Sequence, residues 1–426
     1  MIFSLKIKNF LSFKDEVLFS FEATKDKNLE DFHIVEIKPG VRIGKIGVVY
    51  GANASGKSNL IKTFDFLKSF WFHTPDSKDE KTEVIPFLLD IDSRETPTEF
   101  ELTFFADKTK YIYEVQLTKN SVIKETLSYY PGSQPSNIFT RQLHKRLSEI
   151  KFNNALKISS IAQEEIKVKC IANMSIIAAY NKVNVQLPVM DTAIDWMKNH
   201  YLQAVKPGLQ NLEKYTESIM LQNNDVKNFV LNFLYKADYN ICEVSTKLEK
   251  RVIPDELINF LMNEDISEEE KLRIKKEKTI ELPNTLFTHK VVDEVGDEKQ
   301  FDLPGELQSR GTLRSMGLAG VLKTMLENNA FVAIDEIESS LHPKLVEFYL
   351  ESFLKQSDSS QLLITTHYDG LLEADDLLRN DSIWFTVKKT CGSTELYSLS
   401  DFKGVNRLSS LQKAYKYGKF GAIPNI

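Results

Sequence analysis

The stretch GANASGKS at residues 51–58 decides the fold. It matches the pattern G-x-x-x-x-G-K-[ST] at every position. The apolar run IGVVY at 46–50 precedes it and the helical pattern LIKTF at 60–64 follows it. Gly51 and Gly56 let the backbone curl so that successive N–H groups point at phosphate oxygens, and the helix N-terminus adds its positive dipole end. The sequence therefore predicts a phosphate-binding loop between a buried strand and a helix.

The residue types of this loop predict ATP and Mg²⁺ as cofactors. The Lys57 ammonium can reach the β- and γ-phosphates, and the Ser58 hydroxyl can coordinate Mg²⁺. The residues expected to contact the nucleotide here are Gly51, Asn53, Ala54, Ser55, Gly56, Lys57, Ser58 and Asn59.

A second apolar run, FVAI at 331–334, ends in Asp335 and Glu336. Asp335 is predicted to hold Mg²⁺, and Glu336 to orient or deprotonate the attacking water. Lys57 and Asp335 lie far apart in the chain, whereas compact phosphate-loop enzymes place these two elements much closer. We therefore expect a large insertion between them.

Further motifs carry a resemblance to a known family. The blocks FVAIDEIESSLHP at 331–343 and LLITTHYDG at 362–370 resemble the Walker B, D-loop and switch-histidine segments of ABC/SMC-type ATPases. QSRGT at 308–312 resembles a short form of their signature motif, and LKIKNFLSFKD at 5–15 resembles their first strands. Together with the closing KYGKFGAIPNI, the arrangement is similar to AAA-family single-chain ATPases of bacterial abortive-infection and phage-defence loci, the RloA/AbiL type.

The resemblance implies a homodimer, or a higher oligomer, in which the signature of one subunit contacts the γ-phosphate bound by the other. Ser309 and Gly311 would then bind nucleotide in trans. His367 would lie beside the γ-phosphate and would join Glu336 and Lys57 as a catalytic residue. The role of His342 stays open between communication across subunits and an ordinary helix start, with the following proline in the first turn.

The sequence departs from the family at one point. ABC ATPases usually carry a glutamine loop that senses the γ-phosphate and Mg²⁺. No convincing glutamine stands at that place, since Gln116 lies inside a strand-like run. The segment IPFL at 85–88 is the candidate for the position of this loop.

We expect an α/β fold, an ABC/SMC-type P-loop NTPase head with an antiparallel β subdomain and a helical insertion. Residues 1–133 would form the first part of the head, 134–235 the helical insertion, and 236–426 the second part. A small helical piece is expected near 253–279, where Ser267 fits a helix N-cap.

Composition limits the other classes of protein. The 426 residues are 42% hydrophobic and carry a formal net charge of −6, which is typical of a soluble globular protein. This charge gives no global signal for nucleic acid, although it does not exclude a local basic patch. The three cysteines form no CxxC pair, and the start MIFSLKIKNF lacks the apolar stretch of a signal peptide. No run is long enough to cross a bilayer, so we expect a cytoplasmic protein without a membrane partner.

The favoured function is a dimeric ATPase that acts as a nucleotide-dependent sensor or regulator in anti-phage (abortive infection) defence. It would signal to a partner effector such as a toxin or nuclease. One alternative is a RecF/SMC-like DNA-repair or DNA-binding ATPase, but 134–235 has no sustained heptads. A second alternative is a low-turnover ATP-gated scaffold. Glu336 argues against it, because a protein that only binds ATP needs no positioned base.

Overall fold

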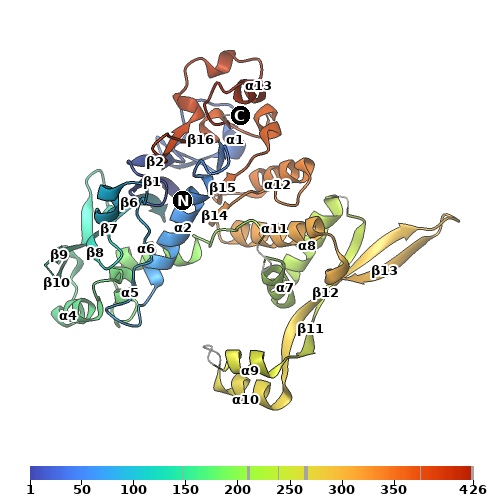
Figure 1. Ribbon diagram of the computed structural model, residues 1–426, viewed down its shortest axis with the longest axis horizontal. Helices are drawn as coiled ribbons and strands as arrows, with labels where there is room; N and C mark the ends of the chain where they lie inside the picture. Colours follow the sequence, from blue (N-terminus) through green and yellow to red (C-terminus); the bar gives the residue numbers. More distant parts are fainter. Residues whose placement is uncertain (146, 209–211, 238, 263–266, 375, 424–426) are drawn as a thin grey trace. The chain divides into compact units, whose positions relative to one another are not determined.

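The computed structural model of the chain describes residues 1–145, 147–208, 212–237, 239–262, 267–374 and 376–423 (Figure 1). Its first compact unit contains Met1–Gly208, Met325–Ser339 and Val346–Ile426, and its second contains Leu209–Thr324 and Ser340–Leu345. Residues 263–266, inside the predicted small helical piece, and 424–426, at the end of the closing motif, lie outside the described residues. Within the described ranges, no helix combines the length and apolarity needed to cross a membrane.

A parallel sheet in the first unit carries the phosphate-loop strand at its centre. The strand order is β14 (Phe331–Ile334), β15 (Gln361–Thr365), β5 (Ile46–Gly51), β16 (Ile383–Lys388) and β17 (Thr394–Ser398), with β17 antiparallel to β16. Every residue of β5 is buried, as expected for a central parallel strand. The strands predicted at 46–50, 331–334 and 362–364 are confirmed, and so is the helix after the loop, α2 (Lys57–Phe72).

An antiparallel sheet forms the other layer of this unit. Its order is β10 (Leu147–Phe152), β9 (Ser136–His144), β8 (Val122–Tyr130), β7 (Thr109–Leu117), β6 (Thr98–Ala106), β1 (Ile2–Lys8) and β2 (Val17–Ser20). The hairpin predicted at 100–118 is confirmed, because β6 pairs with β7 along its whole length, from the pair Thr98–Leu117 to the pair Ala106–Thr109. A separate hairpin joins β3 (Ile34–Lys38) and β4 (Val41–Gly44). The fold is therefore mixed α/β with an antiparallel β subdomain, as predicted.

One hydrophobic core joins α2 to both sheets. The helix buries Leu60, Phe64 and Leu67 at helical spacing. The Phe64 ring lies 4.9 Å from the ring of Phe331 on β14. In the same core, Phe19 of β2 contacts Trp384 of β16 at a ring distance of 5.0 Å. Aromatic contacts of this kind bury large areas, so the loop that precedes α2 stands on a rigid base.

Residues 136–152 are a correction to the helical insertion predicted from 134. They form β9 and β10, and helices begin only with α4 (Ser160–Lys169), α5 (Ile176–Tyr180) and α6 (Pro188–Asn199). These elements belong to the first compact unit, whose boundary lies at 208 instead of at 133. Further helices of the described chain are α1 (Glu30–His33), α3 (Ile91–Glu95), α12 (Pro343–Gln356) and α13 (Leu411–Lys416).

Arg141 explains why the strand β9 escaped prediction. Its guanidinium is buried, donates to the carbonyl oxygens of Met174 at 2.5 Å and Ile171 at 3.0 Å, and lies 3.6 Å from the Glu125 carboxylate. Burial raises the pKa of Glu125, and the charge of Arg141 acts in the opposite direction. A charged residue at an inward position breaks the alternation of apolar residues that indicates a strand.

The second unit contains helices and a three-stranded antiparallel sheet with long strands. Its elements are α7 (Leu212–Gln222), α8 (Asn224–Lys236), β11 (Ile241–Val252), α9 (Asp255–Leu261), α10 (Glu268–Glu277), β12 (Thr279–Val292), β13 (Glu298–Pro304) and most of α11 (Arg310–Glu327). The strands pair in the order β11-β12-β13, and the sheet is visible in Figure 1. The Ser267 side chain accepts from the Glu270 N–H and caps α10, as predicted.

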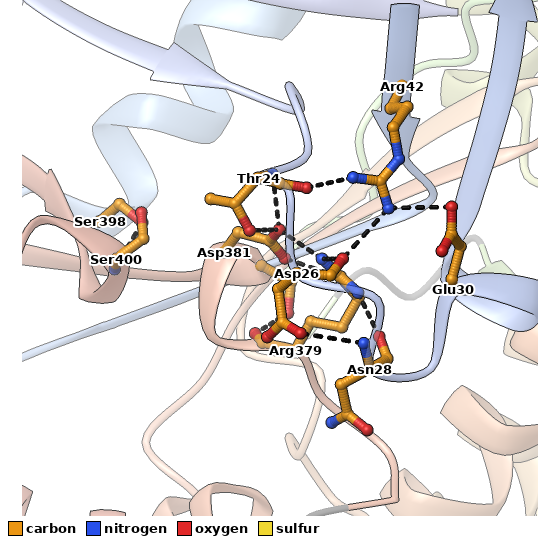
Figure 2. Close-up of polar contacts among 10 residues, drawn as sticks. Thr24, Asp26, Asn28, Glu30, Arg42, Arg379, Asp381, Ser398 and Ser400 are labelled. Carbon is orange, nitrogen blue, oxygen red and sulfur yellow. Dashed lines mark hydrogen bonds and ion pairs between the residues drawn. The ribbon is translucent and has the colours of Figure 1, made fainter. Parts of the chain in front are cut away.

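A polar clasp joins the N-terminal loop at 24–30 to the segment at 379–381 (Figure 2). Arg379 donates to the backbone oxygens of Asp26 and Asn28 and pairs with Asp381 at 2.7 Å. Asp381 also accepts from the Thr24 N–H at 2.8 Å. The Arg379 and Asp381 side chains are only 2% and 8% exposed. Burial alone would raise the pKa of Asp381, but the bonds from Arg379 and Thr24 outweigh it and lower this pKa.

Candidate nucleotide-binding site

A pocket of about 590 Å³ opens at the carboxyl ends of the parallel strands, within the first unit. Residues 53–59 of the loop and of the first turn of α2 line it, together with Glu336 and His367. Its other lining residues are Leu11, Ser12, residues 85–89, Lys388 and Gly392. Crevices at this edge of a parallel sheet are the usual place for ligands in α/β folds.

The loop has room for glycine alone at two positions. Gly56 has a φ of +111°, and a Cβ added there would lie 2.3 Å from the Thr394 hydroxyl oxygen. A Cβ on Gly51 would lie 2.3 Å from the Thr386 hydroxyl oxygen. These threonines, from β17 and β16, hold the loop by bonding the Ser55 carbonyl at 2.7 Å and the Ser55 hydroxyl at 2.6 Å. Adjacent strands thus fix the curl of the loop.

Lys57 lies folded back on its own loop. Its ammonium donates to the carbonyl oxygens of Gly51 at 2.8 Å and Ala52 at 3.1 Å, and the residue is only 5% exposed. Burial lowers the pKa of Lys57, while the nearby carboxylates of Asp335 and Glu336 counteract this effect. An anionic ligand in the pocket would stabilise this desolvated charge further.

The acidic end of the pocket is organised by one hydroxyl group. The Thr365 side chain donates to Asp335 Oδ1 at 2.5 Å and accepts from the Glu336 N–H at 2.8 Å. Asp335 is nearly buried, whereas Glu336 lines the pocket. Glu336 has a φ of +47°, in the left-handed region that non-glycine residues rarely adopt. This turn lets two consecutive carboxylates take different positions.

His367 lines the same pocket immediately after β15. Its backbone N–H donates to Glu338 Oε1 at 2.6 Å. Burial lowers the pKa of His367, and so does the positive charge of Lys57, while the carboxylates of Glu338 and Glu336 act in the opposite direction. The net effect favours the neutral form of the imidazole.

The structure thus brings most of the predicted site residues together. Residues 53–59, Glu336 and His367 line one pocket. Gly51 and Asp335 do not line it, but Gly51 accepts a hydrogen bond from Lys57 and Asp335 is next to Glu336 in the chain. Ser309 and Gly311 belong to the second unit. There the Ser309 hydroxyl accepts from the N–H of the third residue after it, at 3.1 Å, at the start of α11.

His342 stands directly before α12, which begins at Pro343. Its Nδ1 accepts from the Lys344 N–H at 3.2 Å. This bond is what a helix start requires, and a role in communication between subunits stays a prediction.

One wall of the pocket is formed by residues 85–89, of which 85–88 were predicted from the sequence as the candidate position of the glutamine loop. Residues 85–89 line it, and among the described residues no glutamine does. The wall is held by the Leu11 N–H, which donates to the Ile85 carbonyl at 2.9 Å, and by Asn9, whose side chain accepts from the Phe87 N–H at 3.0 Å. Ser12 lies inside the block at 5–15 but was not named as a site residue, and Lys388 and Gly392 were missed because they belong to no motif.

Comparisons with known proteins agree with this architecture. A family model described as "AAA domain, putative AbiEii toxin, Type IV TA system" matches residues 46–373. A comparison with curated protein sequences gave no match.

Similar solved structures include the SMC head domain from Thermotoga maritima, with 14% identity, 93% of this chain and 98% of that chain covered, and a TM-score of 0.40. Another is the SmcHead bound to the C-winged helix domain of ScpA. It is 13% identical, with 97% of this chain and 99% of that chain covered and a TM-score of 0.43. A third is the Smc head domain with an extended coiled coil bound to the C-terminal domain of ScpA derived from Pyrococcus furiosus. It is 12% identical, with 98% of this chain and 98% of that chain covered and a TM-score of 0.40.

The family match spans more than half of the chain. The protein therefore belongs to this AAA-domain family of P-loop ATPases.

Proposed function

We propose that this protein hydrolyses ATP in a Mg²⁺-dependent reaction when two copies enclose the nucleotide, and that its nucleotide state is passed to a partner effector in anti-phage defence. The observation that carries the catalytic part is the convergence of Lys57, Glu336 and His367 on one pocket. These residues come from segments that are distant in sequence. An ordinary acidic turn on the surface would not lie in one pocket with the lysine of the phosphate loop and a histidine.

The donor set fits a nucleoside triphosphate with Mg²⁺. The loop offers backbone N–H groups, and its curl depends on Gly51 and Gly56, where a Cβ would clash with the side chains of Thr386 and Thr394. The Ser58 hydroxyl and the Asp335 carboxylate supply the oxygen ligands that Mg²⁺ prefers. When bound, Mg²⁺ neutralises charge on the β- and γ-phosphates. Lys57 would leave its loop carbonyls and bind these phosphates.

Glu336 and His367 have different roles, one toward the attacking water and the other toward the γ-phosphate. Glu336, held by the Thr365 hydroxyl in a left-handed turn, orients the attacking water and accepts its proton. His367, neutral because of burial and the neighbouring lysine, can donate one hydrogen bond to the γ-phosphate.

The second copy would complete the site through its signature. Ser309 is exposed at the start of α11, where the first-turn N–H groups and the helix dipole favour an anion. A Cβ on Gly311 would lie 3.0 Å from the carbonyl oxygen of Ser340, so a larger residue there would require the Ser340 backbone to shift. We infer that Ser309 and Gly311 bind the γ-phosphate held by the other copy.

The setting in defence is inferred from the family description, which names an AbiEii toxin and a Type IV TA system. The protein would act as a dimeric sensor or regulator, closing with ATP and opening after hydrolysis. The effector would be a toxin or nuclease that reads this change. Co-purification of the native protein with the product of a neighbouring gene, in the presence and absence of ATP, tests this part.

Substitution of two pocket residues tests the catalytic part. Lys57→Ala should weaken ATP binding at least about tenfold, since charged hydrogen bonds to phosphate contribute roughly 1.5–3 kcal/mol each. Glu336→Gln should keep binding, abolish phosphate release and trap an ATP-bound dimer. Titration calorimetry, phosphate release with and without EDTA, and light scattering measure the three quantities.

The control is Glu351→Gln, at an exposed carboxylate of α12 that pairs with Lys355 on the surface. It should match the wild type in all three assays. Normal hydrolysis by Glu336→Gln would show that the general-base assignment is wrong.

A further inference from the structure

The strand order gives the pocket two chemically different ends. β5, which leads into the phosphate loop, lies between β15 and β16. On the β15 side stand Glu336 and His367, the groups suited to the γ-phosphate. On the β16 side stand Lys388 and Gly392, close to the apolar wall. A triphosphate that crosses the loop therefore points its α-phosphate toward β16.

The apolar wall supports this direction. Leu11 and residues 85–89 line the pocket with mostly aliphatic side chains, and a Cβ on Gly392 would lie 2.4 Å from a methyl group of Leu89. Apolar walls of ligand pockets receive the flat, weakly polar part of a ligand. The nucleoside belongs at this wall, and the terminal phosphate belongs at the opposite end.

Lys388 is held beside the phosphate loop by strand register. Thr386 pairs with Gly51 across β16 and β5, and Lys388 pairs with Thr394 across β16 and β17. Both threonines bond Ser55. Because alternate residues of a strand share a face, Lys388 projects on the side of the sheet from which Thr386 reaches the loop.

The Lys388 ammonium has no carboxylate partner within ion-pair distance among the described residues, although it lines the pocket. Its neighbour Lys389 is different. Lys389 projects from the opposite face and pairs with Glu395 at 2.8 Å and Asp15 at 3.8 Å. The chain thus offers two adjacent lysines, one with its charge satisfied and one open to the pocket.

We propose that Lys388 is a second phosphate-binding cation, which contacts the α-phosphate of the bound nucleotide. The inference rests on the proposed ATP site and adds to it a residue outside the phosphate loop. Lys57 would bind the β- and γ-phosphates from one side, and Lys388 would fix the nucleoside end from the other. A lysine suits this role, since it acts as a compact point charge on a flexible stem.

Binding of nucleotides of different length tests the assignment. Wild type, Lys388→Ala, Lys388→Arg and Lys389→Ala are titrated with the β,γ-imido analogue of ATP, ADP and AMP. Lys388→Ala should weaken all three by the same factor, about three- to tenfold for a charged contact discounted for its exposure. Lys388→Arg should restore affinity to within about twofold. Lys389→Ala should bind as the wild type does, because Lys389 has its own carboxylate partners.

Each alternative outcome has a separate meaning. A loss confined to the ATP analogue would place Lys388 at the γ-phosphate, and an unchanged affinity would remove it from the site; both overturn the inference. An equal loss in Lys389→Ala would reduce the effect to general surface charge and would also overturn it. Failure of the wild type to bind any of the nucleotides would instead refute the proposed function.

Discussion

Ala54 and Glu336, both at the pocket, hold backbone angles that side chains usually avoid. Their φ values are +60° and +47°, and such conformations cost about 1–2 kcal/mol each. Strained residues persist where surrounding contacts fix them, and they concentrate at functional sites. For Glu336 the fixing contact is the bond from its N–H to the Thr365 hydroxyl. The same hydroxyl holds Asp335, so Thr365 sets the position of both acids.

The protonation of His367 makes a prediction about pH. Burial and Lys57 lower its pKa below the ordinary value of 6.5, so the neutral form persists to lower pH than for a free histidine. At saturating Mg²⁺, kcat/KM for ATP should stay level from pH 8 to pH 6.5 and fall only below it. This parameter reports groups of the free enzyme.

Glu338→Gln provides the matched test for this profile. The Glu338 carboxylate raises the pKa of His367, so its removal should shift the acid limb to still lower pH. His367→Ala should be slow and should lack the limb. A limb above pH 6.5, or one that survives in His367→Ala, would contradict the assignment.

Sequence alone predicted the motif residues of the site and missed those that support them. The residues from Gly51 to Asn59, with Glu336 and His367, follow from local patterns, because each stands at the end of an apolar run. Thr365, Thr386, Thr394 and Lys388 could not be found in this way, since strand pairing alone brings them to the loop. No local pattern encodes which strand lies beside β5.

At the level of elements, the success of prediction depended on what each element buries. β5, β14 and β15 each contain a continuous apolar run, so a buried strand can be recognised from the sequence alone. β9 instead turns Arg141 inward, and its pattern looked helical. Buried ion pairs are therefore the places where the periodicity of a sequence misleads.

The polar clasp also contains a buried ion pair, between Arg379 and Asp381, and loss of this pair should lower the free energy of unfolding. Arg379→Ala leaves Asp381 buried without its cation, which typically costs about 3–5 kcal/mol. Urea unfolding followed by circular dichroism should register a loss of this order. Arg273→Ala, at an exposed arginine 3.9 Å from Glu270, should change stability by less than about 1 kcal/mol.

The double variant Arg379→Ala/Asp381→Ala separates the two contributions. It should recover part of the loss, because no orphaned carboxylate remains. Wild-type stability of Arg379→Ala would mean that the clasp does not hold the two segments together.

At the level of the whole molecule, the long interval between Lys57 and Asp335 predicted an insertion, and a second compact unit does occupy residues 209–324. The predicted boundaries differ at both ends. Residues 136–208 add strands and helices to the first unit, and residues 236–324, predicted as part of the head, belong to the second unit. Compactness arises from contacts between distant segments, and composition along the chain does not record it.

Closure of two copies makes a prediction at Ser309. In a Glu336→Gln background, Ser309→Arg should abolish the ATP-dependent dimer seen by light scattering, since the bulky cation fills the space for the partner's phosphate. ATP binding by the monomer should stay unchanged. Ser309→Ala removes the same cap on α11, worth about 1 kcal/mol, and the same phosphate contact, but it adds no bulk, so it should weaken the dimer less than Ser309→Arg does. A dimer of normal strength in Ser309→Arg would contradict the role of Ser309 at the partner's phosphate.

The central place of β5 has a consequence for biosynthesis. Its neighbours β15 and β16 follow it by more than 300 residues, and ribosomes add about 5–20 residues per second. A nascent chain therefore carries this strand, which is fully buried in the folded protein, with both edges unpaired for tens of seconds before those neighbours are made. Until then no pocket exists, so a truncated or stalled product is unable to bind ATP and is prone to aggregate. Activity arises only after β15 and β16 have been synthesised.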